Sequence, residues 1–187
     1  MERTSLVYRK DLLALLRGKD GRDTLRRGLL RGPEDCVVQM ALNIPGLPKT
    51  LPGDRETIER TWLHWKGSFY FSSPRIVAWV KNAAGVALLL MFSGEAPRSL
   101  KKAGGRCEEE LPWGRLLDID VYTSRGPLSR ALLGERPRRC FLCEGEAKAC
   151  ARAGTHSLIS LRDAAVALMG RAEGGNARGK APPKSPI

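Results

Sequence analysis

The strongest structural signal in this sequence is a short alternating stretch at residues 114–121. Apolar residues occupy every second position there, and two aspartates lie between them, in the order Leu117, Asp118, Ile119, Asp120 and Val121. Residues two apart in a strand point to the same face of its sheet. The pattern therefore predicts a strand that buries its leucine, isoleucine and valine and presents both carboxylates together on the opposite face.

Asp118 and Asp120 are candidate magnesium ligands and catalytic groups. A hard divalent cation takes oxygen ligands and commonly combines one or two carboxylates with substrate phosphates. Arg115 precedes the pair and is a candidate catalytic contact to a phosphate group. The same pattern also suits a half-buried strand with a solvated polar face, so the aspartates alone leave both interpretations open.

Length and charge limit the class of protein. The chain has 187 residues, a formal charge of +12 and a pI of about 10, which suits one domain with an anionic partner such as a polyphosphate, a nucleic acid or an acidic protein. No signal-peptide pattern opens the chain. The longest apolar run, residues 76–92, is interrupted by Lys81 and Asn82. We therefore expect no membrane span and a cytoplasmic location.

Hydrophobic spacing predicts alternating helices and strands. Gly18 and Gly21 separate two amphipathic helices within residues 6–30, and Asp54 caps a helix that ends near residue 66. The remaining expected elements are strands at 36–44, 75–80 and 86–92, with a buried helix as an alternative for the last two, a short helix or turn at 95–102 and a helix at 160–169. The basic, Gly- and Pro-rich residues 171–187 predict a disordered tail.

The loop at residues 43–49 is a candidate phosphate contact. Its two prolines and Gly46 predict a rigid turn, the glycine lets the backbone approach a phosphate, and Lys49 supplies charge. A plain loop is the alternative. Residues 108–110 are three glutamates just before the aspartate strand, where one can serve as a metal ligand or general base while the others form a solvated turn.

Three of the five cysteines and a histidine form the pattern Cys140-x2-Cys143-x6-Cys150-x5-His156. An odd number of cysteines suits reduced thiols or metal ligands better than a disulfide framework. Four such ligands can close a tetrahedral, structural zinc site. The alternative is a group of buried thiols beside a histidine that caps the next helix.

Several of these motifs together resemble one family. Pro112-x-Gly-Arg-Leu-x-Asp-Ile-Asp-Val, Ser129-Arg130, and Arg139-Cys-x2-Cys-x6-Cys-x-Arg152 followed by His156 are similar to the apo-citrate lyase phosphoribosyl-dephospho-CoA transferases. The upstream Asn43-Ile44-Pro45-Gly46-x-x-Lys49 and the Glu108-Glu109 pair fit the same pattern. The match is dense from residue 108 to residue 161.

The resemblance implies a reaction. A serine of the acyl carrier subunit of citrate lyase attacks triphosphoribosyl-dephospho-CoA at its innermost phosphorus, and pyrophosphate leaves. Asp118 and Asp120 would bind Mg2+, and the paired carboxylates agree with that chemistry. The residues expected to bind substrate are Gly46, Lys49, Gly114, Arg130, Arg138 and Arg139.

The resemblance also implies the fold. We expect an α+β domain over residues 1–170 with a mixed sheet, flanking helices and a nucleotidyltransferase-like architecture, its Cys/His-rich part at 138–170. Neither nucleic acid nor a membrane is then an expected partner. The main alternative is a small zinc-containing nucleic-acid-binding protein, which the charge and the cysteines would also suit.

Overall fold

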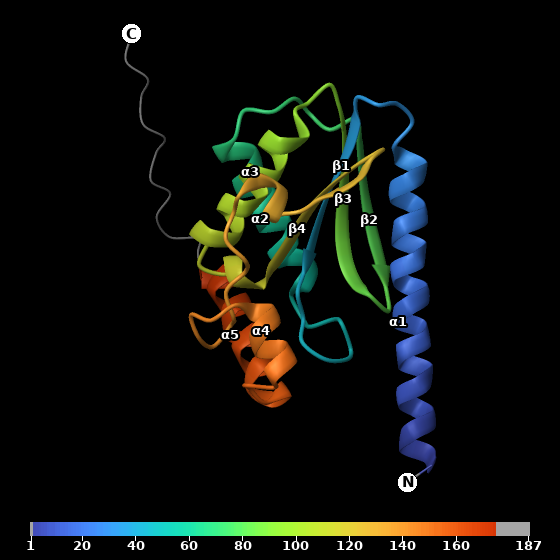
Figure 1. The fold of residues 1–187 in the computed structure, drawn as a ribbon, viewed down its shortest axis with the longest axis vertical. Helices are drawn as coiled ribbons and strands as arrows, with labels where there is room; N and C mark the ends of the chain where they lie inside the picture. Colours follow the sequence, from blue (N-terminus) through green and yellow to red (C-terminus); the bar gives the residue numbers. More distant parts are fainter. Residues whose placement is uncertain (1, 175–187) are drawn as a thin grey trace.

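The computed structural model describes residues 2–174 (Figure 1). Its helices and strands follow in the order α1 (Glu2–Leu29), β1 (Asp35–Leu42), α2 (Asp54–Ser68), β2 (Ile76–Asn82), β3 (Gly85–Ser93), α3 (Pro97–Glu110), β4 (Leu117–Thr123), β5 (Gly126–Leu128), α4 (Ala147–Ala153) and α5 (Leu158–Gly174). Two short 3-10 turns, η1 (Gly114–Leu116) and η2 (Ala131–Leu133), flank β4 and β5. The expected α+β class is confirmed.

The sheet has five strands in the order β2-β3-β1-β4-β5, and every neighbouring pair is antiparallel. The expectation of a mixed sheet is therefore wrong. The helical connections explain the difference. The connection through α2 joins β1 to β2, which lie on either side of β3, and the connection through α3 joins β3 to β4, which lie on either side of β1. Each connection thus links two strands that run the same way but are separated by an antiparallel strand.

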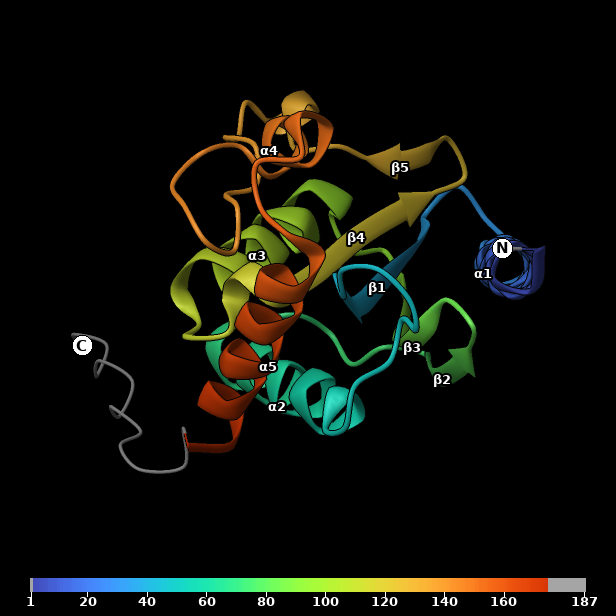
Figure 2. The same ribbon diagram turned by 90° about the horizontal axis from the view of Figure 1, so that it is seen from below.

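Helices cover both faces of the sheet (Figure 2). On one face, α2, α3 and α5 bury the main core, in which Trp65, Leu100 and Ile119 are at most 1% exposed. On the other face, Val37, Leu89 and Met91 pack against Leu29 and Leu30 at the end of α1. Burial of both faces drives the layers together.

Helix α1 is continuous, so the expected division into two helices at Gly18 and Gly21 is wrong. Gly18 is required for close packing: a Cβ there would lie 2.8 Å from Oδ1 of Asn82 and 2.9 Å from the backbone nitrogen of Ala84. The Asn82 amide also donates to the Gly18 carbonyl oxygen at 3.0 Å. The glycine lets α1 approach the β2–β3 turn, and a single glycine costs a helix only about 1 kcal/mol.

Strand β4 confirms the alternation seen in the sequence. Leu117, Ile119 and Val121 are buried, whereas Asp118 and Asp120 are partly exposed. Residues 114–116 form η1 instead of extending the strand. A Cβ at Gly114 would lie 2.5 Å from the Glu108 carbonyl oxygen, so the glycine lets this turn fold tightly against the end of α3.

Three helix boundaries differ from expectation. Helix α2 begins at Asp54 with Gly53 as its N-cap, so Asp54 does not cap it. Helix α3 reaches Glu110 and takes in the three glutamates at 108–110, at least two of which were expected in a turn. Helix α5 runs to Gly174, and the rest of the expected tail, 175–187, lies outside the described residues. Among the helices of the described chain, none is both long and apolar enough to cross a membrane.

Candidate active site

Strand β4 is held at its outer edge by two side chains of α3. Strand β5 pairs only with residues 121–123, which leaves the peptide groups of Ile119 facing α3. The Lys101 ammonium donates to the Ile119 carbonyl oxygen at 2.6 Å, and the Ile119 N–H donates to Oε1 of Glu108 at 2.7 Å. The two α3 residues are seven apart and so lie on one side of the helix. They satisfy backbone groups that would otherwise be buried without partners.

Glu108 is also the anchor for two arginines. Its side chain is only 4% exposed, and it pairs with Arg130 through Oε2 and with Arg138 through Oε1, the latter at 2.9 Å. Arg130 additionally lies 3.5 Å from Glu109. A buried carboxylate with two guanidinium partners and a backbone donor is fully hydrogen-bonded. Glu108 therefore fixes both arginines beside β4.

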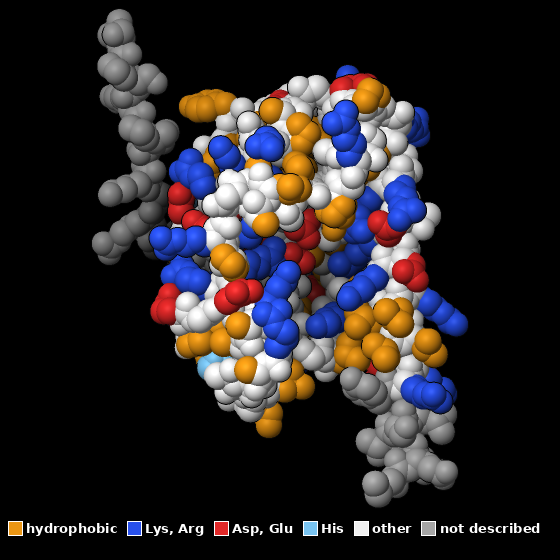
Figure 3. All heavy atoms as spheres, in the orientation of Figure 1, with side chains coloured by type: hydrophobic (Ala, Val, Ile, Leu, Met, Phe, Trp, Pro, Cys, Tyr) orange, Lys and Arg blue, Asp and Glu red, His pale blue; other side chains and the backbone are white. Residues whose placement is uncertain are grey.

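This face of the molecule is hollowed, and acidic side chains lie in the hollow with Lys and Arg side chains on both sides (Figure 3). Arg138 contacts Oδ1 of Asp118 at 2.6 Å, and Lys101 contacts Oδ1 of Asp120 at 3.1 Å. Each aspartate side chain retains 33% exposure. Asp118 and Asp120 lie on the same face of β4 as Tyr122, whose ring contacts Arg26 of α1, and we assign both aspartates to this hollow. The nearby carboxylates raise the pKa of Arg138 well above its usual value despite burial, so Arg138 stays charged.

Helix α1 forms the second wall of this hollow. Arg22 is buried and donates to the Gly85 carbonyl oxygen at 2.6 Å, and burial together with the charge of Arg26 lowers the pKa of Arg22. Arg26 lies 4.0 Å above the Tyr122 ring and donates to Gln39 at 2.6 Å. Burial and the charge of Asp120 raise the pKa of Tyr122 to about 12.

Glu108 also lines a cleft of about 660 Å³ that is rich in arginine. Its lining residues are Glu108, Glu109, Gly114, Arg115, Leu117, Arg130, Arg136, Pro137, Arg138, Arg139, Glu144 and Glu146. Arg138 connects the cleft to Asp118, because one guanidinium nitrogen contacts both carboxylates.

Glu144 positions two more of the cleft arginines. It accepts from Arg115 at 2.5 Å and from Arg139 at 3.0 Å, and these partners lower the pKa of Glu144. Arg115 also donates to the Cys140 carbonyl oxygen at 3.1 Å. The cleft wall is thereby attached to the cysteine-rich segment.

The structure does not place two of the expected substrate-binding residues in this cleft. The Lys49 ammonium donates to the Ile44 carbonyl oxygen at 2.7 Å, and burial, Lys19 and Arg162 lower its pKa. Gly46 adopts φ +65° and packs against Leu158, which a Cβ would approach to 2.7 Å. It lines a separate cleft beside the cysteines.

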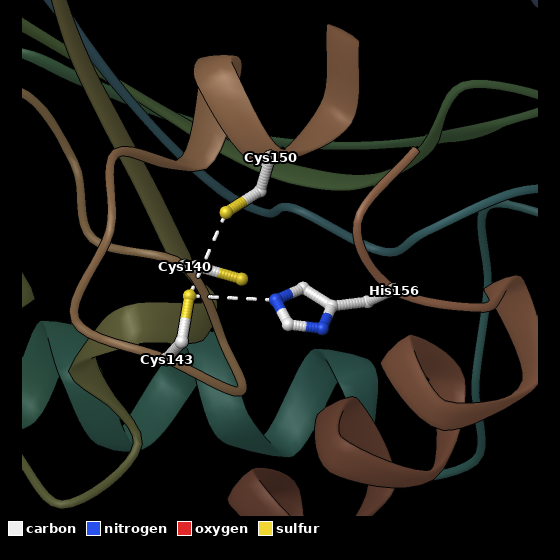
Figure 4. A group of neighbouring side chains, drawn as sticks. All are labelled: Cys140, Cys143, Cys150 and His156. Carbon is white, nitrogen blue, oxygen red and sulfur yellow. Dashed lines mark hydrogen bonds between the residues drawn. The ribbon is translucent and has the colours of Figure 1, made fainter. Parts of the chain in front are cut away.

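Cys140, Cys143, Cys150 and His156 come together as a group that could hold a metal ion (Figure 4). Their ligand atoms all lie within 4.8 Å of one another, and Sγ of Cys143 lies 3.5 Å from Sγ of Cys150 and 3.4 Å from Nε2 of His156. Tetrahedral zinc with metal–sulfur bonds of about 2.3 Å requires sulfurs about 3.8 Å apart. The donor set and the spacing fit such an ion.

Sequence reasoning missed several residues of this site. Lys101, Arg22 and Arg26 reach it only through the packing of α3 and α1, and no motif marks them. The three glutamates at 108–110 were considered without a choice among them. Glu108 is the buried member, while Glu109 and Glu110 are exposed, in line with the expectation that most of the three are solvated.

The chain is similar to known proteins over most of its length. A family model for apo-citrate lyase phosphoribosyl-dephospho-CoA transferase matches residues 10–171. A "Probable apo-citrate lyase phosphoribosyl-dephospho-CoA transferase" of Streptococcus pyogenes serotype M5 (strain Manfredo) is 31% identical over 160 residues, 83% of each protein. An apo-citrate lyase phosphoribosyl-dephospho-CoA transferase of Escherichia coli O1:K1 / APEC is 46% identical over 89 residues, 47% of this chain and 48% of the relative.

The family model extends from within α1 to within α5 and includes the residues of the hollow, the arginine cleft and the cysteine cluster. These matches confirm the resemblance drawn from the short motifs and favour a transferase over a nucleic-acid-binding protein. The chain belongs to the family of apo-citrate lyase phosphoribosyl-dephospho-CoA transferases.

Proposed function

We propose that the hollow over Asp118 and Asp120 is where the chain transfers the phosphoribosyl-dephospho-CoA group to the acyl carrier subunit of citrate lyase. The donor would be triphosphoribosyl-dephospho-CoA. A serine hydroxyl of the carrier attacks its innermost phosphorus, a phosphodiester forms, and the bond to the leaving pyrophosphate breaks. The observation that carries this proposal is the pair of carboxylates on one strand face with arginines anchored beside them.

Asp118 and Asp120 are the residues that would hold Mg2+. They share one face of β4, and their contacts to Arg138 and Lys101 use Oδ1 of each carboxylate, so Oδ2 of each would be available to a metal ion. Bound Mg2+ would supply charge stabilisation for the phosphate oxygens. Oxygen ligands on a rigid strand suit this hard cation. The nucleotidyltransferase-like architecture that the family resemblance implies is part of this proposal.

The cleft arginines would bind the phosphates of the donor. Arg130 and Arg138 are oriented by Glu108, and Arg115 and Arg139 by Glu144. Preorganised cations of this kind stabilise charge that develops on the leaving pyrophosphate without reorganising during the reaction. Arg138 reaches both the cleft and Asp118 and would bridge the reacting phosphoryl group and the leaving group.

We further propose that the cysteine cluster binds zinc in a structural role. Four protein ligands leave no open position for water or substrate. The segment that carries Arg138 and Arg139 leads directly into Cys140, and Arg115 donates to the Cys140 carbonyl oxygen. The ion would hold these arginines at the wall of the cleft. Lys49 and Gly46 would act from a distance, by shaping the loop next to the cluster.

The test is mass spectrometry of the unmodified carrier subunit incubated with enzyme, donor and Mg2+. We expect a mass gain equal to the transferred group with wild type and none with Asp118→Asn or Asp120→Asn. Asp163→Asn, an exposed aspartate on α5, is the matched control and should keep wild-type activity. No mass gain with wild type and an active donor would overturn the proposal. Near-normal turnover by Asp118→Asn would remove that residue from the site.

A further inference from the structure

We infer that the side of α1 bordering the hollow is the docking surface for the carrier protein. The carrier would contact it with apolar side chains of its own that are surrounded by carboxylates. The inference rests on the proposed function and adds the place where the acceptor binds. Its basis is an apolar patch, the position of that patch beside the aspartates, and the charges around it.

The patch consists of Leu12, Leu13 and Leu16. These side chains are 39%, 54% and 45% exposed. Leu16 lies four residues after Leu12 and three after Leu13, so the three leucines are neighbours on the helix surface. Figure 3 shows hydrophobic side chains gathered on this part of α1, next to the hollow. Several large apolar side chains exposed together on one helix are typical of an interaction surface.

The patch is continuous with the wall of the hollow. Leu12, Lys19 and Arg26 are seven residues apart and therefore lie along one side of α1. Arg26 covers the ring of Tyr122, which is on the same face of β4 as Asp120. The side of the helix that faces the aspartates thus continues through Lys19 to the leucines. A protein bound to the leucines would lie at the entrance of the hollow.

The charges beside the patch favour an acidic partner. Arg9 and Arg17 lie one helical turn before and after Leu13, and all three are exposed. Asp20 is the acid one turn beyond Leu16. An acidic carrier domain would complement the two arginines. A second copy of this chain would instead bring like-charged arginines together across a symmetric contact, because such a contact uses the same surface twice.

Docking there would leave the acceptor serine free to enter the hollow. The donor phosphates would occupy the arginine cleft, whose lining, within the described chain, includes no residue of α1, so the two substrates would reach Asp118 and Asp120 from different elements. Carrier binding on α1 and donor binding in the cleft should therefore be separable by mutation.

The test compares Leu13→Asp with Val166→Asp. Both residues are 54% exposed and lie on helices, α1 and α5, so the two changes place the same charge in similar settings. Calorimetry with the purified unmodified carrier subunit, without donor, gives the Kd, and transfer assays give KM and kcat. We expect Leu13→Asp to raise both the carrier Kd and KM by about tenfold or more, with donor binding and kcat near wild type. Val166→Asp should match wild type throughout.

Arg17→Glu is the second variant and covers the case in which Leu13→Asp fails to fold. It should weaken carrier binding, and most strongly at low salt. Carrier affinity unchanged in both variants would overturn the inference. A wild-type dimer that Leu13→Asp converts to a monomer with unchanged carrier affinity would also overturn it, because α1 would then be a self-association surface. Failure of the proposed function is distinct: wild type would bind the carrier but not modify it.

Discussion

Replacing Glu108 with Gln tests whether one buried carboxylate organises the site. The substitution keeps the shape of the side chain and removes its charge. In the wild-type structure, the two carboxylate oxygens contact Arg130, Arg138 and the Ile119 N–H. An amide has only one acceptor oxygen, so it cannot replace all three contacts, and its NH2 group would face a guanidinium donor.

The expected cost follows from burial. Removing one member of a buried ion pair costs about 3–5 kcal/mol. The cost should be lower here, because Arg130 and Arg138 are 13% and 27% exposed and retain contacts to Glu109 and Asp118. We expect Glu108→Gln to lower the free energy of unfolding by about 2–3 kcal/mol. For a chain of this size that corresponds to a fall in Tm of about 4–12 °C.

Urea unfolding followed by circular dichroism measures this effect, and Glu109→Gln is the matched control. The Glu109 side chain is 59% exposed and lies 3.5 Å from Arg130, so its loss should change stability by less than about 0.5 kcal/mol. Transfer activity should fall in Glu108→Gln, because two arginines lose their anchor, and remain in Glu109→Gln. Equal unfolding midpoints for the two variants would refute the role given to Glu108.

Three further predictions concern the metal cluster, a half-buried phenol and a tight turn. Cys143→Ser should lose bound zinc and lower Tm, with transfer activity falling as a consequence, since metal binding and folding are coupled. Elemental analysis showing no zinc in wild type, or an unchanged Tm in the variant, would contradict this. The folded-state pKa of Tyr122 is about 12 against an ordinary value of 10, so the folded state retains its proton longer and stability falls as the pH rises from 10 to 12; Tyr122→Phe should reduce that fall in alkaline urea titrations. Gly85→Ala should cost about 1–3 kcal/mol, because φ is +98° and a Cβ would lie 2.4 Å from the Lys49 carbonyl oxygen. Gly67→Ala, with no neighbour within 4 Å, should not destabilise the fold, and equal melting curves for the two variants would contradict the clash.

Local patterns were sufficient for the parts of the site that are close in sequence. The alternation around Asp118 and Asp120 predicted which residues of β4 are buried, because side-chain direction in a strand follows from a two-residue period. The spacing Cys140-x2-Cys143 predicted the metal-ligand group, because a short turn suffices to bring two such thiols together. The motifs that resembled the transferase family also lie in this contiguous part of the chain.

Only the tertiary structure decided which segments meet. The sheet is antiparallel because each helical connection passes over an intervening strand. The spacing of apolar residues within one strand does not show which strand will lie beside it. Gly18 resembled a helix end but is the point where α1 touches the β2–β3 turn. The partners of Glu108 lie 22 and 30 residues away in the chain, and Lys101 reaches β4 through α3 packing. Such contacts depend on the close approach of distant segments, which a local pattern does not encode.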